Sequence, residues 1–212
     1  MFRISLPPHL LRTIAPGAAL ALLAGLAGCG GSRGPAPPPV SPSSATEQAL
    51  AEYDANKDGA LDAKELEHSP GLKALLTALG KDAGGRLTAD ELTQHLQALR
   101  DGGAGRTRAS CQVLFDGRPL AGATVRYVPE KFLGAGFKPA AGTTDAAGFA
   151  SPVTEGEQEG ITPGLYRVEV SKKDAQGRET IPARYNTETT LGCAVGFQTR
   201  GAGGSVVFQL KK

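Results

Sequence analysis

The segment 54–65 places oxygen-bearing side chains at regular intervals around a central glycine, Gly59. Calcium is a hard cation that takes about six to eight oxygen ligands from carboxylates, amides and backbone carbonyls. Gly59 stands where such a loop turns sharply and where a side chain would clash. We therefore expect this segment to bind one calcium ion. The predicted ligands are the side chains of Asp54, Asn56, Asp58, Asp62 and Glu65 and the backbone carbonyl of Ala60.

This spacing resembles the calcium-binding loop of the EF-hand family, and 54–65 matches all the diagnostic positions of that loop. The resemblance implies a helix on each side. Apolar spacing predicts an entering helix through Tyr53, a short exit helix near 63–68, and a further helix after Ser69-Pro70. An acidic turn between two helices, without a bound ion, is the alternative interpretation.

EF-hands occur in pairs, so a second loop is expected. Aligning Leu87 with Leu61 and Glu91 with Glu65 places it at 80–91. The first ligand position of this loop is a glycine, which has no side chain. We therefore expect a degenerate loop that pairs with the first but binds no ion. Its ligand positions hold Gly80, Asp82, Gly84, Thr88 and Glu91, with Gly85 at the turn.

From residue 109 onward, short alternating apolar runs are separated by Gly, Pro and Asp, which predicts about six or seven short strands in an antiparallel β-sandwich. The amino-acid sequence of this region resembles the transthyretin-like or carboxypeptidase-regulatory-like domains of exported bacterial proteins. That resemblance implies a non-catalytic interaction or spacer module. The segments that carry it are 115–125, 144–148, 163–168 and 181–185. The predicted strands are 111–115, 123–128, 143–144, 149–153, 164–171, 189–197 and 205–210.

Residues 1–28 combine Arg3 and Arg12 with a short apolar run and no acidic residue, which is typical of a secretory signal peptide. The run ends at Cys29, and Leu26-Ala27-Gly28-Cys29 resembles the lipobox of bacterial lipoproteins. This implies a lipid on Cys29, a membrane contact through that lipid, and a place in the cell envelope at the outer membrane or cell surface. An ordinary signal peptide that happens to contain a cysteine is the alternative.

Export implies an oxidising compartment, in which Cys111 and Cys193 are expected to form a disulfide. Closing a loop of this length would stabilise the fold by about 4 kcal/mol. Two buried, unreactive thiols in adjacent strands are the alternative.

The predicted organisation is a multidomain α + β chain with opposite charges in its two modules. Residues 45–105 carry 6 basic and 11 acidic side chains, and 106–212 carry 14 and 10. This balance excludes a nucleic-acid-binding class, and the absence of His from 106–212 argues against a Ser-His-Asp or Cys-His enzyme. The predicted segments are a signal peptide (1–28), a lipidated Pro-rich linker (29–44), an EF-hand pair (45–101), a Gly-rich linker (102–108) and a sandwich (109–212).

Two functions from different classes remain open. The first is an exported, lipid-anchored calcium-binding protein that holds one ion, does no covalent chemistry and contacts an envelope protein or glycan. The second is an accessory lipoprotein that binds carbohydrate or a small solute on aromatic rings. In that case the tyrosines Tyr127, Tyr166 and Tyr185 would carry the binding.

Overall fold

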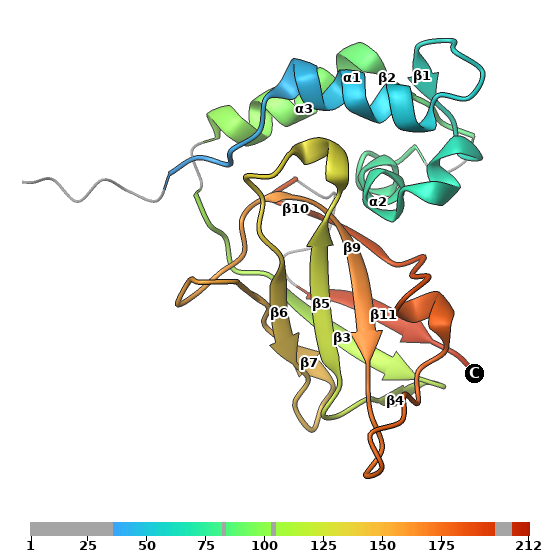
Figure 1. The fold of residues 1–212 in the computed structure, drawn as a ribbon, viewed down its shortest axis with the longest axis vertical. Coiled ribbons are helices and arrows are strands. Elements are labelled where there is room, and N and C mark those ends of the chain that lie inside the picture. Colours follow the sequence, from blue (N-terminus) through green and yellow to red (C-terminus); the bar gives the residue numbers. More distant parts are fainter. Residues whose placement is uncertain (1–35, 82–83, 103–104, 198–204) are drawn as a thin grey trace, which may run out of the picture. The chain divides into compact units, whose positions relative to one another are not determined.

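The computed structural model describes residues 36–81, 84–102, 105–197 and 205–212. Residues 33–212 form one compact unit, which contains α-helices and several antiparallel sheets (Figure 1). The predicted α + β class is confirmed at this level. The signal peptide, Cys29 and the first part of the Pro-rich linker lie outside the described residues.

The α-helices of the described residues all precede the long strands in the chain. They are α1 (Pro42–Tyr53), α2 (Pro70–Ala78) and α3 (Ala89–Asp101), and a short 3-10 helix, η1 (Glu65–His68), lies between α1 and α2. Helix α1 starts at Pro42 because proline needs no hydrogen-bond partner for its nitrogen in a first turn. Thr88 and Glu91 form the capping box of α3, with Thr88 Oγ1 accepting from the Glu91 N–H and the Glu91 carboxylate accepting from the Thr88 N–H.

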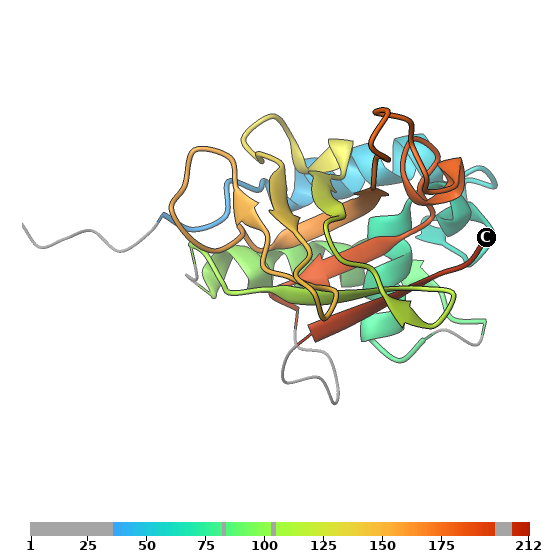
Figure 2. The same ribbon diagram turned by 90° about the horizontal axis from the view of Figure 1, so that it is seen from below.

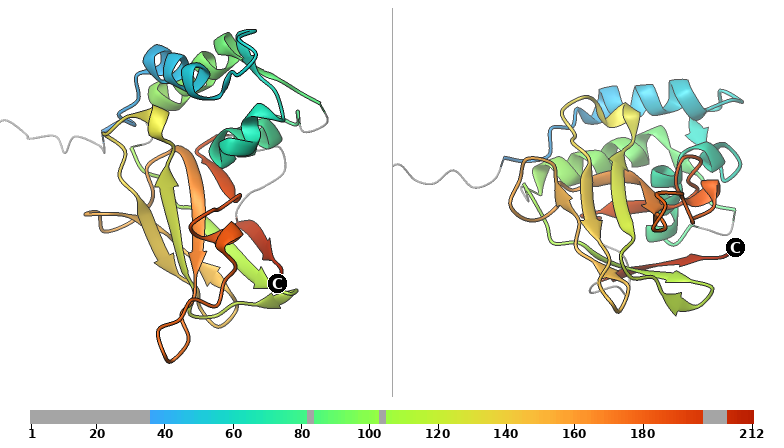
Figure 3. Two further views of the ribbon diagram at one scale, coloured as in Figure 1. Left: turned by 45° about the vertical axis from the view of Figure 1, so that its right-hand side comes forward. Right: turned by 60° about the horizontal axis from the view of Figure 1, so that its bottom comes forward.

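The helices share one apolar core with a part of the strand region. Helices α1 and α3 pack side by side (Figure 3, right). The ring of Phe132 contacts that of Tyr53 edge-on, with centroids 6.4 Å apart. Burial of these apolar side chains from both halves of the sequence is the main favourable term that joins them. The core includes Leu61, Leu66, Leu72, Leu75, Leu87, Leu92, Leu96, Phe132, Leu133 and Leu165.

The larger sheet has five strands in the order β10-β9-β5-β6-β8, all antiparallel. Its longest strand, β9, shows the alternating burial expected over most of its length. The strands are β5 (Thr124–Pro129), β6 (Ala140–Thr143), β8 (Val153–Thr154), β9 (Gly164–Ser171) and β10 (Gly192–Val195).

The smaller sheet has the order β11-β3-β4, with β7 also paired to β3. Its strands are β3 (Ser110–Phe115), β4 (Arg118–Pro119), β7 (Phe149–Ala150) and β11 (Ser205–Leu210). The expectation of antiparallel pairing throughout is wrong here, because β11 runs parallel to β3, from Ser205 beside Ser110 to Leu210 beside Phe115 (Figure 2). These strands stand far apart in the chain, so no hairpin fixes their relative direction.

The predicted strand 149–153 is in fact two strands in different sheets. Strand β7 pairs with β3, whereas β8 pairs with β6. Ser151 and Pro152 separate them, and a proline has no N–H with which to continue a ladder. The chain therefore crosses from one sheet to the other at this point.

Helix α2 packs directly against strands β10 and β9 (Figure 3, left). Gly192 of β10 permits this approach, since a Cβ there would lie 1.8 Å from the carbonyl oxygen of Pro70. Gly71 has the same role on the helix, because a Cβ there would lie 2.7 Å from Cγ of Glu130. Two glycines thus bring the start of α2 into backbone contact with the larger sheet.

Across the described ranges, no helix has both the length and the apolar character needed to cross a membrane.

Candidate metal centre

The loop 54–65 turns all five predicted side-chain ligands toward its own backbone. The Asp54 carboxylate accepts the N–H groups of Asp58 (3.2 Å) and Gly59 (3.0 Å). Asn56 Oδ1 also accepts the Asp58 N–H, at 2.9 Å. Asp62 Oδ1 accepts the N–H of Glu65 at 3.0 Å and that of Lys64 at 2.8 Å. The loop is therefore held by hydrogen bonds from its own backbone N–H groups to these side-chain oxygens.

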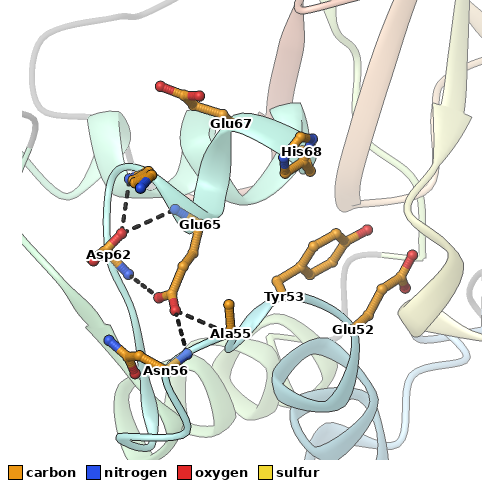
Figure 4. A pocket seen from close by; sticks show the side chains of 9 residues that line it. Glu52, Tyr53, Ala55, Asn56, Asp62, Glu65, Glu67 and His68 are labelled. Atoms are coloured by element: carbon orange, nitrogen blue, oxygen red, sulfur yellow. Dashed lines mark hydrogen bonds between the residues drawn. The ribbon is translucent and has the colours of Figure 1, made fainter.

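The Glu65 carboxylate closes the loop across its two ends. Its Oε1 accepts the N–H groups of Ala55 at 2.9 Å and Asn56 at 3.2 Å, and its Oε2 accepts that of Asp62 at 3.0 Å. Figure 4 shows this carboxylate pointing from η1 back toward Asn56, beside the pocket that Glu52 and Tyr53 also line. The last predicted ligand thus reaches the first residues of the loop.

Two residues of the loop adopt left-handed backbone angles. Lys57 has φ 58° and Gly59 has φ 78°. A glycine adopts this conformation without steric cost, which explains its place at the turn. The expected short exit helix is η1, a 3-10 helix of one turn. It ends at His68, and Ser69 is its C-cap directly before Pro70 starts α2.

The predicted pairing between the two loops is confirmed. Strand β1 (Ala60–Leu61) lies antiparallel to β2 (Leu87–Thr88), with Leu61 opposite Leu87. Both leucines are buried in the core that the helices share. When the two loops are aligned on these leucines, Arg86 stands at the loop position of Ala60 and Glu91 at that of Glu65.

The second loop has a different turn from the one predicted. Gly84, not Gly85, has the left-handed angle, with φ 76°. Gly85 is needed for another reason, since a Cβ there would lie 2.2 Å from the carbonyl oxygen of Lys81. Asp82, a predicted ligand position, lies outside the described residues. The other positions lack carboxylates except at Glu91, as the sequence indicates.

A salt bridge crosses from the second loop to the first. Arg86 Nη2 lies 2.5 Å from Asp58 Oδ2, while Asp58 Oδ1 accepts the N–H of Ala60 at 3.1 Å. Both side chains of the salt bridge are exposed to solvent. The guanidinium therefore neutralises part of the acidic charge at the loop and competes with a cation for Asp58.

The donor set of the first loop fits calcium in kind and number. Each carboxylate has about four acceptor sites, so oxygens that accept a backbone N–H keep capacity for a cation. Within the described part of the chain, the side chains do not converge into a ready metal cluster of three or more His, Cys, Asp or Glu. Binding therefore requires the carboxylates, Glu65 above all, to reorient from backbone amides toward the ion.

Ser69 and Glu130 connect the segment after the loop to the larger sheet. Glu130 is only 2% exposed, and its Oε1 accepts from Ser69 Oγ at 3.1 Å and from the Gly71 N–H at 2.8 Å. Burial raises the pKa of Glu130, although these two donors and Arg167 partly offset the effect. Burial and the nearby Glu130 carboxylate also raise the pKa of Tyr53 to about 12.

The expected disulfide is not present, because Cys111 and Cys193 are free, buried thiols. Cys111 lies on β3 of the smaller sheet and Cys193 on β10 of the larger one, so they are not on adjacent strands. Both lie within one apolar cluster, together with Tyr127. The two cysteines are thus apolar core residues of the two sheets.

Two of the tyrosines considered for carbohydrate binding are part of the core. Tyr127 is 1% exposed and Tyr166 is 0% exposed, and their rings pack edge-on at 5.9 Å. Tyr185 is partly buried against the same cluster, and the guanidinium of Arg184 lies 4.9 Å from its ring centroid. A sugar could not stack on Tyr127 or Tyr166 without unfolding this core.

Comparisons of the chain with protein-family models, with curated proteins and with solved structures find no match. The interpretation of the site therefore depends on its own residues and geometry.

Proposed function

We propose that the chain is an exported, lipid-anchored calcium-binding protein with one ion in the loop 54–65. The observation that carries this proposal is that all five side-chain ligands accept hydrogen bonds from the backbone of one loop, which Glu65 closes. The lipid anchor rests on the sequence around Cys29 alone. In this proposal the helical segment is an EF-hand pair and the strand region is a non-catalytic β-sandwich that serves as a spacer or interaction module.

The calcium ligands would be Asp54, Asn56, Asp58, Asp62 and Glu65 through their side chains and Ala60 through its carbonyl oxygen. The loop carries four carboxylates against two lysines, Lys57 and Lys64, so its net charge is negative and calcium would offset it. Its binding would draw Glu65 inward and thereby fix η1, which leads to Ser69 and the start of α2. The ion would therefore stabilise the junction between the helices and the larger sheet.

Thermal unfolding of the full chain with calcium and with a chelator tests the proposal. A ligand that binds only the folded state stabilises it by about 2.7 kcal/mol at a concentration one hundred times its Kd. We expect calcium to raise the melting temperature, and we expect Glu65→Gln to remove most of that rise. Glu67→Gln removes the same charge from the same short helix and should leave the rise intact. If calcium raised the melting temperature equally in both variants, the proposal would be contradicted.

A further inference from the structure

The first position of the second loop is Gly80, yet the loop is closed and paired with the first. In a calcium loop of this kind, the ion is coordinated by the carboxylate at the last position and by the backbone carbonyl at the seventh. Because Gly80 supplies no ligand at the first position, we expect another positive group to bridge these two acceptors in the second loop.

Lys81 directs its ammonium group into the second loop. Its Nζ forms a salt bridge with Glu91 Oε1 and lies 3.4 Å from the carbonyl oxygen of Arg86. When the two loop sequences are aligned on Leu61 and Leu87, these two groups correspond to the Ala60 carbonyl and the Glu65 carboxylate of the first loop. The ammonium thus contacts the counterparts of two proposed calcium ligands.

The backbone holds Lys81 in this position. The Gly85 N–H donates to the carbonyl oxygen of Lys81 at 3.0 Å, and a Cβ on Gly85 would lie 2.5 Å from Cβ of Lys81. The Gly85 N–H closes this turn, and the close approach to the backbone of residue 81 is what requires glycine at position 85.

The Glu91 carboxylate has a cationic partner, unlike that of Glu65. Its Oε2 accepts from the N–H of Thr88 at 3.1 Å and from the Thr88 hydroxyl at 3.2 Å, while Oε1 pairs with Lys81. The lysine and the Thr88 amide together hold the pKa of the Glu91 carboxyl below its usual range. Glu65, by contrast, accepts only backbone amides within its own loop.

We propose that Lys81 is a tethered cation that takes the place of a metal ion in the second loop and limits the pair to one calcium. The limit of one ion rests on the proposed function, whereas the role of Lys81 in closing the second loop does not. The ammonium is part of the chain, so the second loop stays closed at any calcium concentration. It gives the first loop a permanent partner for its β1–β2 pairing.

Thermal unfolding of the full chain in excess chelator tests this role in the absence of calcium. Lys81→Met removes the charge and keeps an unbranched side chain, and it should lower the melting temperature by about 2–4 °C. Lys81→Arg retains a cation and should stay close to the wild type. Lys73→Met, which removes an exposed lysine of α2, should change the melting temperature by less than about 1 °C. Equal shifts for Lys81→Met and Lys73→Met would overturn the proposal.

A double-mutant cycle separates the salt bridge from a general structural effect. In a Glu91→Gln background, Lys81→Met should lower the melting temperature clearly less than it does in the wild type, because the interaction between the two side chains is already lost. An equally large decrease in both backgrounds would show that Lys81 does not act through Glu91. A wild-type chain that takes up no calcium would contradict the proposed function, while these chelator measurements would still decide the role of Lys81.

Discussion

The Ser69 hydroxyl group donates a 3.1 Å hydrogen bond to the Glu130 carboxylate, although the two residues stand 61 positions apart in the chain. Ser69 follows the short helix that begins with Glu65, and Glu130 follows directly after β5. The bond therefore links the exit of the candidate calcium loop to the larger sheet. Both side chains are buried, so water cannot replace either partner without cost.

Replacing Ser69 with alanine should destabilise the protein noticeably. The change removes one of two donors to a buried carboxylate, and a hydrogen bond to a charged group contributes about 1–3 kcal/mol. Urea unfolding at neutral pH measures the loss. Ser43→Ala on the exposed side of α1 is the control, and it should change the free energy of unfolding by less than about 0.5 kcal/mol. Equal effects at both serines would contradict a special role for Ser69.

Glu130 should make the protein more stable in mild acid than at neutral pH. Burial raises its folded pKa above the ordinary value of 4.5, so the folded state holds this proton more tightly than the unfolded state. Its contribution is complete below pH 4.5 and is lost as the pH rises through the folded pKa. Glu130→Gln should remove this loss, because an amide oxygen still accepts from Ser69 and Gly71.

The measurement for Glu130 is the free energy of unfolding of wild type and Glu130→Gln from pH 4 to 8. The variant should gain stability relative to the wild type as the pH rises. A constant difference between the two proteins across this range would be inconsistent with a raised pKa at Glu130.

Cys111 and Cys193 should be unreactive in the folded protein and fully reactive in denaturant. Burial raises the pKa of Cys193 to about 12 and also raises that of Cys111. At pH 8 only about one Cys193 thiol in ten thousand would be ionised, and the thiolate is the nucleophile. Alkylation of a Cys29→Ser chain, followed by mass spectrometry, counts the thiols. Fast alkylation of the folded protein would show that the thiols are not buried. No alkylation in denaturant without a reductant would show that they are not free.

Removal of Arg86 should raise the calcium affinity of the first loop. Its guanidinium pairs with Asp58, a proposed ligand, and it repels a dication. Because the pair is exposed, the gain in Arg86→Ala should reach at most about fivefold. The gain should shrink as salt screens the interaction. Arg100→Ala on α3 removes an equal charge elsewhere and serves as the control. A loss of affinity in Arg86→Ala would show that this arginine instead positions Asp58 for binding.

The sequence predicts the local parts of this structure well and the long-range parts less well. The opposition of Leu61 and Leu87 could be predicted because both loops follow one spacing, and the capping box at Thr88 is a local signal. Ser69 could only be recognised as a helix start, since nothing near it in the sequence points to Glu130. The role of Lys81 could not be predicted either, because the second position of such a loop supplies no calcium ligand and no particular residue type is expected there.

The strand region shows the same division. Most strands lie close to their predicted places because alternation of apolar residues is a local pattern. The parallel pairing of β11 with β3, and the change of sheet at Pro152, depend on which distant strands meet. The free state of Cys111 and Cys193 could not be predicted either, because it depends on which sheets their distant strands join.

Calorimetric titration of the full chain with calcium measures directly whether 54–65 binds the ion. We expect about one ion per chain, with binding abolished in the double variant Asp54→Ala/Glu65→Gln. A double variant of two acidic residues outside the loop, Glu67→Gln/Asp90→Ala, should bind as the wild type does. No heat of binding at millimolar calcium, or undiminished binding by the loop variant, would show that 54–65 is not a calcium site.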